Sequence, residues 1–205
     1  MKTLVIDSAT EACSVALFDG VALVAGDWRM LGRGHAEQLV PMIEALPGKG
    51  QADRIAVALG PGSFTGVRVG LAAARALAFA WNAELVGYPT LALIAAAALN
   101  EQPGAPVTVC TTGGHGEWFV QEFEANGAAR SELASLPPAT AAERTGTDLV
   151  AGSQSQALVS QRGHGTALEI WPDARAFHLL QSGQLSTDTA PLYGRAPDAR
   201  LPGAA

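Results

Sequence analysis

The spacing of apolar and polar residues changes several times along the first hundred positions, and each change predicts a different element. Residues 3–7, 14–18 and 21–28 are short apolar runs, with Asp19-Gly20 between the last two. Such runs predict three strands, and Asp-Gly between two of them is typical of a tight β-hairpin.

From residue 35 the apolar positions take a helical spacing. Up to residue 46 they fall on one side of a helix, with Glu37 and Glu44 on the other side. Further along, the pattern predicts a buried strand over 54–60, a helix over 64–81, a strand over 84–88 and a helix over 90–99. Strands followed by alternating strands and helices predict an α/β fold with mixed sheets flanked by helices.

A polar stretch rich in breakers, NEQPGAP at residues 100–106, predicts a boundary between two lobes. We expect an N-terminal lobe over residues 1–100, a smaller second lobe over 101–190 and a tail over 191–205. The second half opens like the first, with strands predicted at 107–110 and 117–123 around the turn TTGGHG and one more at 148–152. The period is too loose to establish a repeat from sequence.

The composition limits the possible partners. Hydrophobic residues make up 48% of the 205 residues, and the formal net charge of −6 leaves no broad basic face for a nucleic-acid backbone, so another protein would have to hold any RNA. Cys13 and Cys110 lie far apart in apolar runs, which favours buried free thiols. No signal peptide or membrane-spanning segment is predicted, and we expect a cytoplasmic protein.

Four glycines and a proline mark residues 60–70, GPGSFTGVRVG, between a predicted strand and a predicted helix. A nucleotide P-loop requires a Gly-Lys pair, and the dinucleotide fingerprint requires a glycine where Thr65 stands. Neither pattern is present. Residues 60–62 instead predict a turn, and Ser63 the N-cap of a helix that begins near Phe64.

Opposite faces of this helix differ in character. We expect close packing on the chain's own sheet for the face that carries Gly66, Gly70, Ala73 and Leu77. The other face carries Arg68, Leu71, Arg75 and Phe79. A helix that is apolar nearly all round requires a second cover, which another subunit or the preceding helix could supply.

Two polar turns are candidate phosphate-binding sites. Asp7, Ser8 and Thr10 follow the first strand, where a carboxylate could hold magnesium through water and hydroxyls could meet phosphate oxygens. Gly113-Gly114-His115 lies at the corresponding turn of the second half, and ordinary hairpin turns are the alternative at both places. The histidines lack a metal-binding spacing and no nucleophile has an identifiable base, so we expect no metal, no cofactor and no catalytic residue.

Three segments, MKTLVIDSATEACSVAL, GHAEQLVPMIEAL and GPGSFTGVRVGLAAARALA, resemble in order and spacing the TsaB (YeaZ) family, which acts in threonylcarbamoyladenosine modification of tRNA. The resemblance covers residues 1–100 best, and PLYGRAPDAR is similar to the family's closing segment. It implies an actin-like (ASKHA, RNase H-like) fold of two lobes and a catalytic paralogue, TsaD. TsaD carries a metal-binding H-x-x-x-H where this chain has His35 and Leu39, which implies that the metal site is missing here.

The resemblance also implies the partners. In the family, the helices at 34–46 and 64–80 pack on the same helices of TsaD, so the expected interface residues are His35, Leu39, Met42, Ile43, Leu46, Phe64, Arg68, Leu71, Arg75 and Phe79. The ATPase TsaE is a further expected partner, tRNA is reached only indirectly, and a homodimer is expected when TsaD is absent. The turn TTGGHG and Ala9 depart from the family's pattern, which argues against nucleotide binding.

We interpret the chain as a non-catalytic scaffold and activator for threonylcarbamoyl transfer to N6 of adenosine 37 in tRNAs that read codons starting with A. Two alternatives are an actin-like small-molecule kinase or glycoprotease-type enzyme, and a stand-alone homodimer. A kinase requires acidic residues in both lobes, and only Asp7 and Asp148 are candidates.

Overall fold

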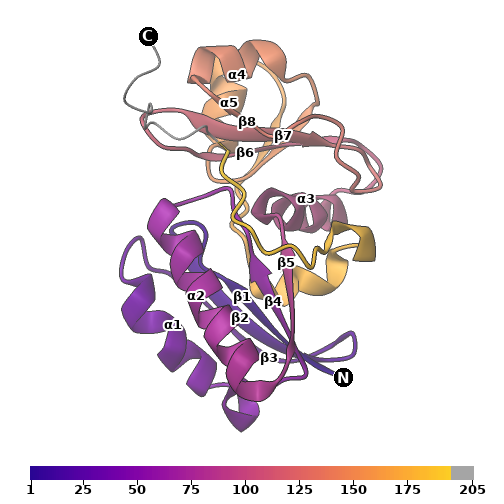
Figure 1. The fold of residues 1–205 in the computed structure, drawn as a ribbon. Helices are drawn as coiled ribbons and strands as arrows, with labels where there is room; N and C mark the ends of the chain where they lie inside the picture. Colours follow the sequence, from indigo (N-terminus) through magenta and orange to yellow (C-terminus); the bar gives the residue numbers. More distant parts are fainter. Residues whose placement is uncertain (195–205) are drawn as a thin grey trace.

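The structure, a computed structural model, describes residues 1–194. It contains two five-stranded sheets, one above the other in Figure 1, with helix α3 between them. The predicted tail 191–205 and the segment PLYGRAPDAR lie mostly outside the described residues. Within residues 1–194 no helix is long and apolar enough to cross a membrane.

The first sheet contains the strands predicted for the first half of the chain. They are β1 (Lys2–Asp7), β2 (Ala12–Asp19), β3 (Ala22–Met30), β4 (Arg54–Ala58) and β5 (Glu84–Tyr88), in the order β3-β2-β1-β4-β5. β2 is antiparallel to both β1 and β3, whereas β4 is parallel to both β1 and β5. The predicted hairpin at Asp19-Gly20 is confirmed, and Gly20 has the positive φ of 60° that favours glycine in such a turn.

Helices α1 (His35–Glu44) and α2 (Phe64–Trp81) lie side by side on one face of this sheet (Figure 1), and the short 3-10 helix η1 (Pro47–Gly50) follows α1. The predicted start of α2 is confirmed, because Gly66 N donates to Ser63 Oγ at 3.3 Å. The small face of α2 packs on the sheet as predicted. A Cβ on Gly70 would lie 2.5 Å from Ser8 Oγ, so only glycine permits this approach.

The second sheet repeats the topology of the first. Its strands are β6 (Val107–Thr112), β7 (Trp118–Phe123), β8 (Ala134–Leu136), β9 (Leu149–Ala151) and β10 (Thr166–Leu168), in the order β10-β9-β6-β7-β8. β6 takes the place of β1, since it is antiparallel to β7 and parallel to β9. The sequence pattern misses β8, β10, α4 (Pro138–Arg144) and α5 (Ser155–Arg162), which are short and only partly apolar.

Two segments pack across the predicted boundary at residue 100. Helix α3 (Thr90–Glu101) contributes Leu91, Ile94 and Ala98 to the apolar core of the second lobe. After β10 the chain returns to the first sheet, where the 3-10 helix η2 (Ala174–Leu179) packs on β1, β2 and β3. The boundary therefore separates the two sheets, but each lobe's core contains residues from the other side of it.

Residues 186–194, which we call the C-terminal strap, run along the outer strand of the first sheet after the 3-10 helix η3 (Ser182–Gln184). Ser186 pairs with Gly87 of β5, and Leu192 N donates to Leu59 O at 2.8 Å. The pairing of Ser186 with Gly87 covers part of the exposed edge of β5, and the bond to Leu59 holds the strap to the segment that follows β4. They also bring the end of the strap to the space between the lobes.

Candidate functional site

The glycines of residues 60–66 let the start of α2 pack against the first hairpin turn. A Cβ on Gly62 would lie 2.0 Å from Ala9 O, and one on Gly66 would lie 2.2 Å from Ser8 O. Ser63 N also donates to Ala9 O at 2.6 Å. The two backbone segments therefore touch, and glycine is required at both positions because any side chain would separate them.

Asp7 lies at the end of β1, on the face of the sheet opposite to α2. Side chains alternate along a strand, so Ile6 faces α2, whereas Asp7 and its partner in register, Ser14, face η2. Ala174 N donates to Ser14 Oγ at 2.9 Å, which closes this end of the sheet with a segment from much later in the chain. Asp7 is fully buried as a result.

Burial raises the pKa of the Asp7 carboxyl from 3.8 to about 7, although hydrogen bonds from Ala9 and Tyr88 oppose the rise. Ala9 N donates to Asp7 Oδ1 at 3.0 Å, and Tyr88 Oη lies 3.1 Å from Ile6 O and 3.3 Å from Asp7 Oδ2. The Tyr88 hydroxyl has one proton for these two oxygens. A protonated Oδ2 can donate to Tyr88 Oη while Tyr88 donates to Ile6 O, so the neutral acid satisfies every group.

The structure corrects the prediction that Asp7, Ser8 and Thr10 present polar atoms to a phosphate and magnesium. The three residues lie together, but they are 0%, 2% and 6% exposed. Ser8 Oγ donates to Gly66 O at 2.9 Å, and Ala12 N donates to Thr10 Oγ1 at 3.3 Å. Their polar atoms already have internal partners, and of the three only Thr10 borders the pocket between the lobes.

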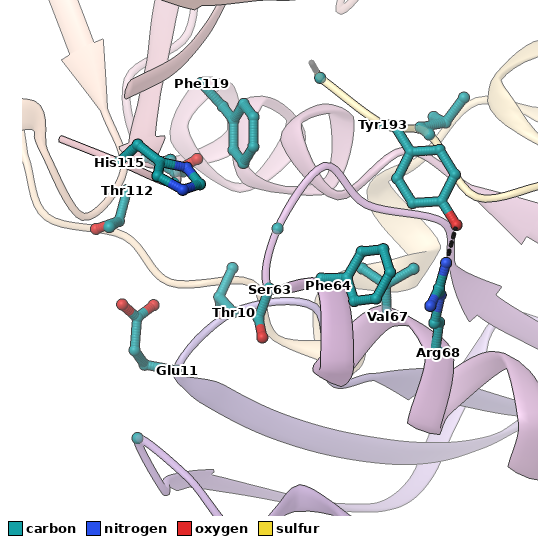
Figure 2. Close-up of a pocket in the computed structure, with 17 residues that line it drawn as sticks. Thr10, Glu11, Ser63, Phe64, Val67, Arg68, Thr112, His115, Phe119 and Tyr193 are labelled. Carbon is teal, nitrogen blue, oxygen red and sulfur yellow. Dashed lines mark hydrogen bonds between the residues drawn. The ribbon is translucent and has the colours of Figure 1, made fainter. Parts of the chain in front are cut away.

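This pocket, which we call the interlobe pocket, has a volume of about 650 Å³ and lies between the two lobes (Figure 2). Both predicted polar turns border it, Thr10-Glu11 from the first lobe and residues 111–115 from the second. The start of α2 and the end of the C-terminal strap complete its walls. Figure 2 shows the rings of Phe64, Phe119 and Tyr193 around the space.

Arg68 holds the C-terminal strap against α2 at the side of the interlobe pocket. Its guanidinium carbon lies 3.4 Å from the centroid of the Phe64 ring, and its Nη2 donates to Tyr193 Oη at 3.1 Å, the dashed line in Figure 2. Two turns further along α2, Arg75 Nη2 donates to Thr189 O at 2.9 Å. Each arginine is therefore engaged within the chain.

The structure divides the predicted partner interface into buried and exposed residues. Six of the ten are at most 8% exposed: His35, Leu39, Met42, Ile43, Leu46 and Leu71. Phe64 and Phe79 are 59% and 91% exposed. The prediction is therefore corrected for the six, whose side chains face the chain's own interior and are not available to a partner.

The error at Leu71 has a geometric cause. Leu71 lies about 60° round the helix from Arg68, at about 100° per residue, so it sits between the outer face and the sheet-facing side. It belongs to the same apolar core as Leu39 and Met42 of α1, which packs beside α2. The other apolar residues on the same side of α1 also pack in this core.

His35 is 8% exposed, and its Nε2 has no hydrogen-bond partner among residues 1–194. Leu39, one turn later on α1, is buried in the core. In the part of the chain that the structure describes, no group of three or more His, Cys, Asp or Glu residues could hold a metal ion.

Some residues at the pocket and surface escape sequence analysis. Phe119, Leu192 and Tyr193 come together only through the fold, and their local sequence gives no signal of a pocket. Val40 is 51% exposed on α1. Its position outside the apolar side of the predicted helix could have identified it as a surface residue.

Comparison with known proteins identifies similar sequences and folds. A family model described as "TsaD: tRNA N6-adenosine threonylcarbamoyltransferase" matches residues 29–183. The Escherichia coli protein named "tRNA threonylcarbamoyladenosine biosynthesis protein TsaB" is 35% identical over 130 residues, which are 60% of this chain and 55% of that protein. The chain thus spans about half the length of the curated relatives it matches.

Solved structures agree with this result. "YeaZ from Pseudomonas aeruginosa" is 27% identical with a TM-score of 0.76, over 94% of this chain and 99% of that chain. The ethanolamine utilization protein EutJ from Carboxydothermus hydrogenoformans is 14% identical with a TM-score of 0.50, over 87% of this chain and 89% of that chain, and indicates the fold alone. The actin-like fold of two lobes with mixed sheets is confirmed.

Proposed function

The chain belongs to the family of the tRNA N6-adenosine threonylcarbamoyltransferase model, and within it to the TsaB (YeaZ) proteins, and we propose that it is a non-catalytic subunit in tRNA modification. In this proposal it binds and activates TsaD, which transfers the threonylcarbamoyl group to N6 of adenosine 37 in tRNAs that read codons starting with A. TsaE is the further partner.

One argument for a non-catalytic role is the side chain at position 39. The resemblance to TsaD places a metal-binding histidine there, but this chain has Leu39, which is 1% exposed in the apolar core. His35 alone is a single imidazole, and protein sites for catalytic metals use about three ligands or more. The chemistry of TsaD therefore has no equivalent on α1 of this chain.

The observation that carries the proposal is the outward surface of α1 and α2, which we call the outer face. Its exposed apolar residues are Ala36, Val40, Pro41, Ala72, Ala76, Phe79 and Ala80, and the exposed charged residues Glu37, Glu44, Arg68 and Arg75 lie on the same two helices. Phe79 is 91% exposed, although it lies within α2, two residues before the end of this helix. An apolar surface with small residues and one protruding ring favours a protein partner, and Phe79 is the expected anchor.

Reconstitution with TsaD, TsaE, tRNA and threonylcarbamoyl-adenylate tests the proposal. The chain alone should form no modified adenosine, and its addition should raise the yield obtained with TsaD. Phe79→Asp should remove TsaD binding and activation, because a carboxylate buried in an apolar contact loses its hydration without gaining a partner. Val21→Asp is the matched control, since Val21 is 86% exposed and lies on the β2–β3 hairpin rather than on α1 or α2.

Modified adenosine formed by this chain without TsaD would contradict the non-catalytic role. Equal TsaD binding by Phe79→Asp and Val21→Asp would show that the outer face is not the contact surface. In the absence of TsaD the same face can pair with a second copy through a two-fold axis. Light scattering should therefore detect a homodimer that Phe79→Asp dissociates and TsaD replaces by a heterodimer.

A further inference from the structure

The walls of the interlobe pocket are mainly apolar. Phe64 and Val67 come from α2, Phe119 from β7, and Leu192 and Tyr193 from the C-terminal strap. The volume of about 650 Å³ lies within the range of about 300–1,000 Å³ typical of sites for small organic molecules. Such walls favour a ligand with an apolar, preferably aromatic, body.

One hydroxyl in these walls has no partner. Thr111 lines the interlobe pocket and is 2% exposed, and its Oγ1 has no hydrogen-bond partner among residues 1–194. Thr111 pairs in register with Phe119, so both side chains lie on the same side of the sheet, and Phe119 points into the pocket in Figure 2. Because buried polar groups in proteins are nearly always hydrogen-bonded, Thr111 favours a ligand that carries a polar atom.

The first turn of α2 offers donors to an anion on the facing wall. Ser63 and Phe64 both line the pocket, and Ser63 accepts hydrogen bonds from Gly66 N and Val67 N. The amides of Phe64 and Thr65 have no acceptor within the described residues. Together with the Arg68 guanidinium they attract negative charge.

The charge that the pocket can balance is small. The titratable side chains that line the pocket are Arg68, Glu11 and His115, and the helix N-terminus is equivalent to about half a positive charge. No lysine is among the described lining residues. A triphosphate would therefore leave several negative charges without partners, whereas a single negative charge can be accommodated.

We propose that the interlobe pocket binds a small organic monoanion with an aromatic body. Its carboxylate or sulfonate faces the first turn of α2 and Arg68, its rings lie among Phe64, Phe119 and Tyr193, and Thr111 bonds to a polar atom on the body. This site is inferred from the pocket alone and not from the proposed role in tRNA modification. It lies at the start of α2, where Phe64 and Arg68 line it, whereas Phe79 lies near the end of this helix.

The test uses 8-anilino-1-naphthalenesulfonate, an aromatic monoanion whose fluorescence rises in apolar surroundings. Gly114→Phe and Gly114→Trp place a ring at the pocket, which Gly114 borders and where a Cβ on Gly114 would meet no atom within 4 Å. Ala80→Trp is the matched control, a large ring on the exposed side of α2 outside the pocket. We expect one probe molecule per chain, bound about tenfold or more weakly by both pocket variants and unchanged in Ala80→Trp.

Two further measurements distinguish this site from a nucleotide site and from a purely apolar pocket. Arg68→Gln should weaken binding of the anionic probe about fivefold more than binding of the neutral N-phenyl-1-naphthylamine, whose change measures the effect of the lost contacts with Phe64 and Tyr193 on the pocket walls. MgATP at about 1 mM should not displace the probe. Displacement by MgATP would overturn the proposal in favour of a nucleotide site, and equal loss of both probes in Arg68→Gln would overturn the role of the charge.

Unchanged binding in both pocket variants, or tighter binding in Ala80→Trp, would place the probe on the outer face and overturn the proposal. Amide NMR shifts in the unmodified protein provide a measurement that does not rely on any variant. With 1-naphthalenesulfonate we expect shifts at Thr111, Phe119 and Tyr193. Shifts confined to α1 and to the residues of the outer face would contradict the site.

Discussion

Asp7→Asn should stabilise the protein at neutral and alkaline pH and remove part of its pH dependence. The asparagine has nearly the shape of the protonated acid, its Oδ1 can accept from Ala9 N, and its Nδ2 can donate to Tyr88 Oη, as a proton on Oδ2 would. It is neutral at every pH. The substitution therefore keeps the hydrogen bonds of the neutral acid and removes the ionisation.

The magnitude follows from the pKa of the buried carboxyl. A rise of the Asp7 pKa from 3.8 in the unfolded chain to about 7 in the fold corresponds to about 4 kcal/mol, at about 1.4 kcal/mol for each tenfold change in proton affinity. The folded state binds this proton more tightly, so the stabilisation is complete below about pH 4 and is lost as the pH rises through about 7. The figure is an upper bound, because any opening that hydrates the ionised carboxylate reduces it.

Urea unfolding of both proteins at several values between about pH 5 and pH 8 measures this effect, read as the difference in unfolding free energy between them. The difference should rise in favour of Asp7→Asn by up to about 3 kcal/mol over this range. The second Nδ2 proton of the asparagine can shift the unfolding free energy of the variant, but this shift is the same at every pH and does not affect the rise. Asp148→Asn, at an exposed carboxylate, is the control and should show no such trend. A difference that stays constant with pH would refute the argument, since Asp7 would then bind no extra proton on folding.

Three substitutions test how α2 is packed and capped. Gly70→Leu should lower the melting temperature and reduce the free energy of unfolding by about 1–3 kcal/mol, because the Cβ alone would lie 2.5 Å from Ser8 Oγ. Unchanged melting would mean that α2 does not approach this turn so closely. Leu71→Glu should destabilise the isolated chain by about 3 kcal/mol or more, because it buries a carboxylate in the core. A stable, soluble variant would show that Leu71 lies at the surface. Ser63→Ala should cost about 1 kcal/mol in urea unfolding through loss of the cap on Gly66 N, and no loss would argue against the cap.

Local features of the first lobe were predictable because they depend on residues close in sequence. Apolar runs bounded by turn residues identify β1, β2, β4 and β5, and the order of Ser63 after a Gly-Pro-Gly turn identifies the start of α2. The short strands and helices of the second lobe were not predictable. A strand of three residues, such as β8 or β10, shows less than two periods of alternation and depends on its neighbours for its conformation.

Sequence alone determined which helix faces are apolar, but only the tertiary structure decided what covers each one. Leu39, Met42 and Ile43 of α1 and Leu71 of α2 are apolar whatever covers them, and they face the core because the two helices pack together on the first sheet. Asp7 is polar in sequence and buried in the fold because Ala174 returns to β2 from 160 positions later. Period and capping act within a few residues, whereas burial depends on contacts between distant segments, and the interlobe pocket exists only where such segments meet.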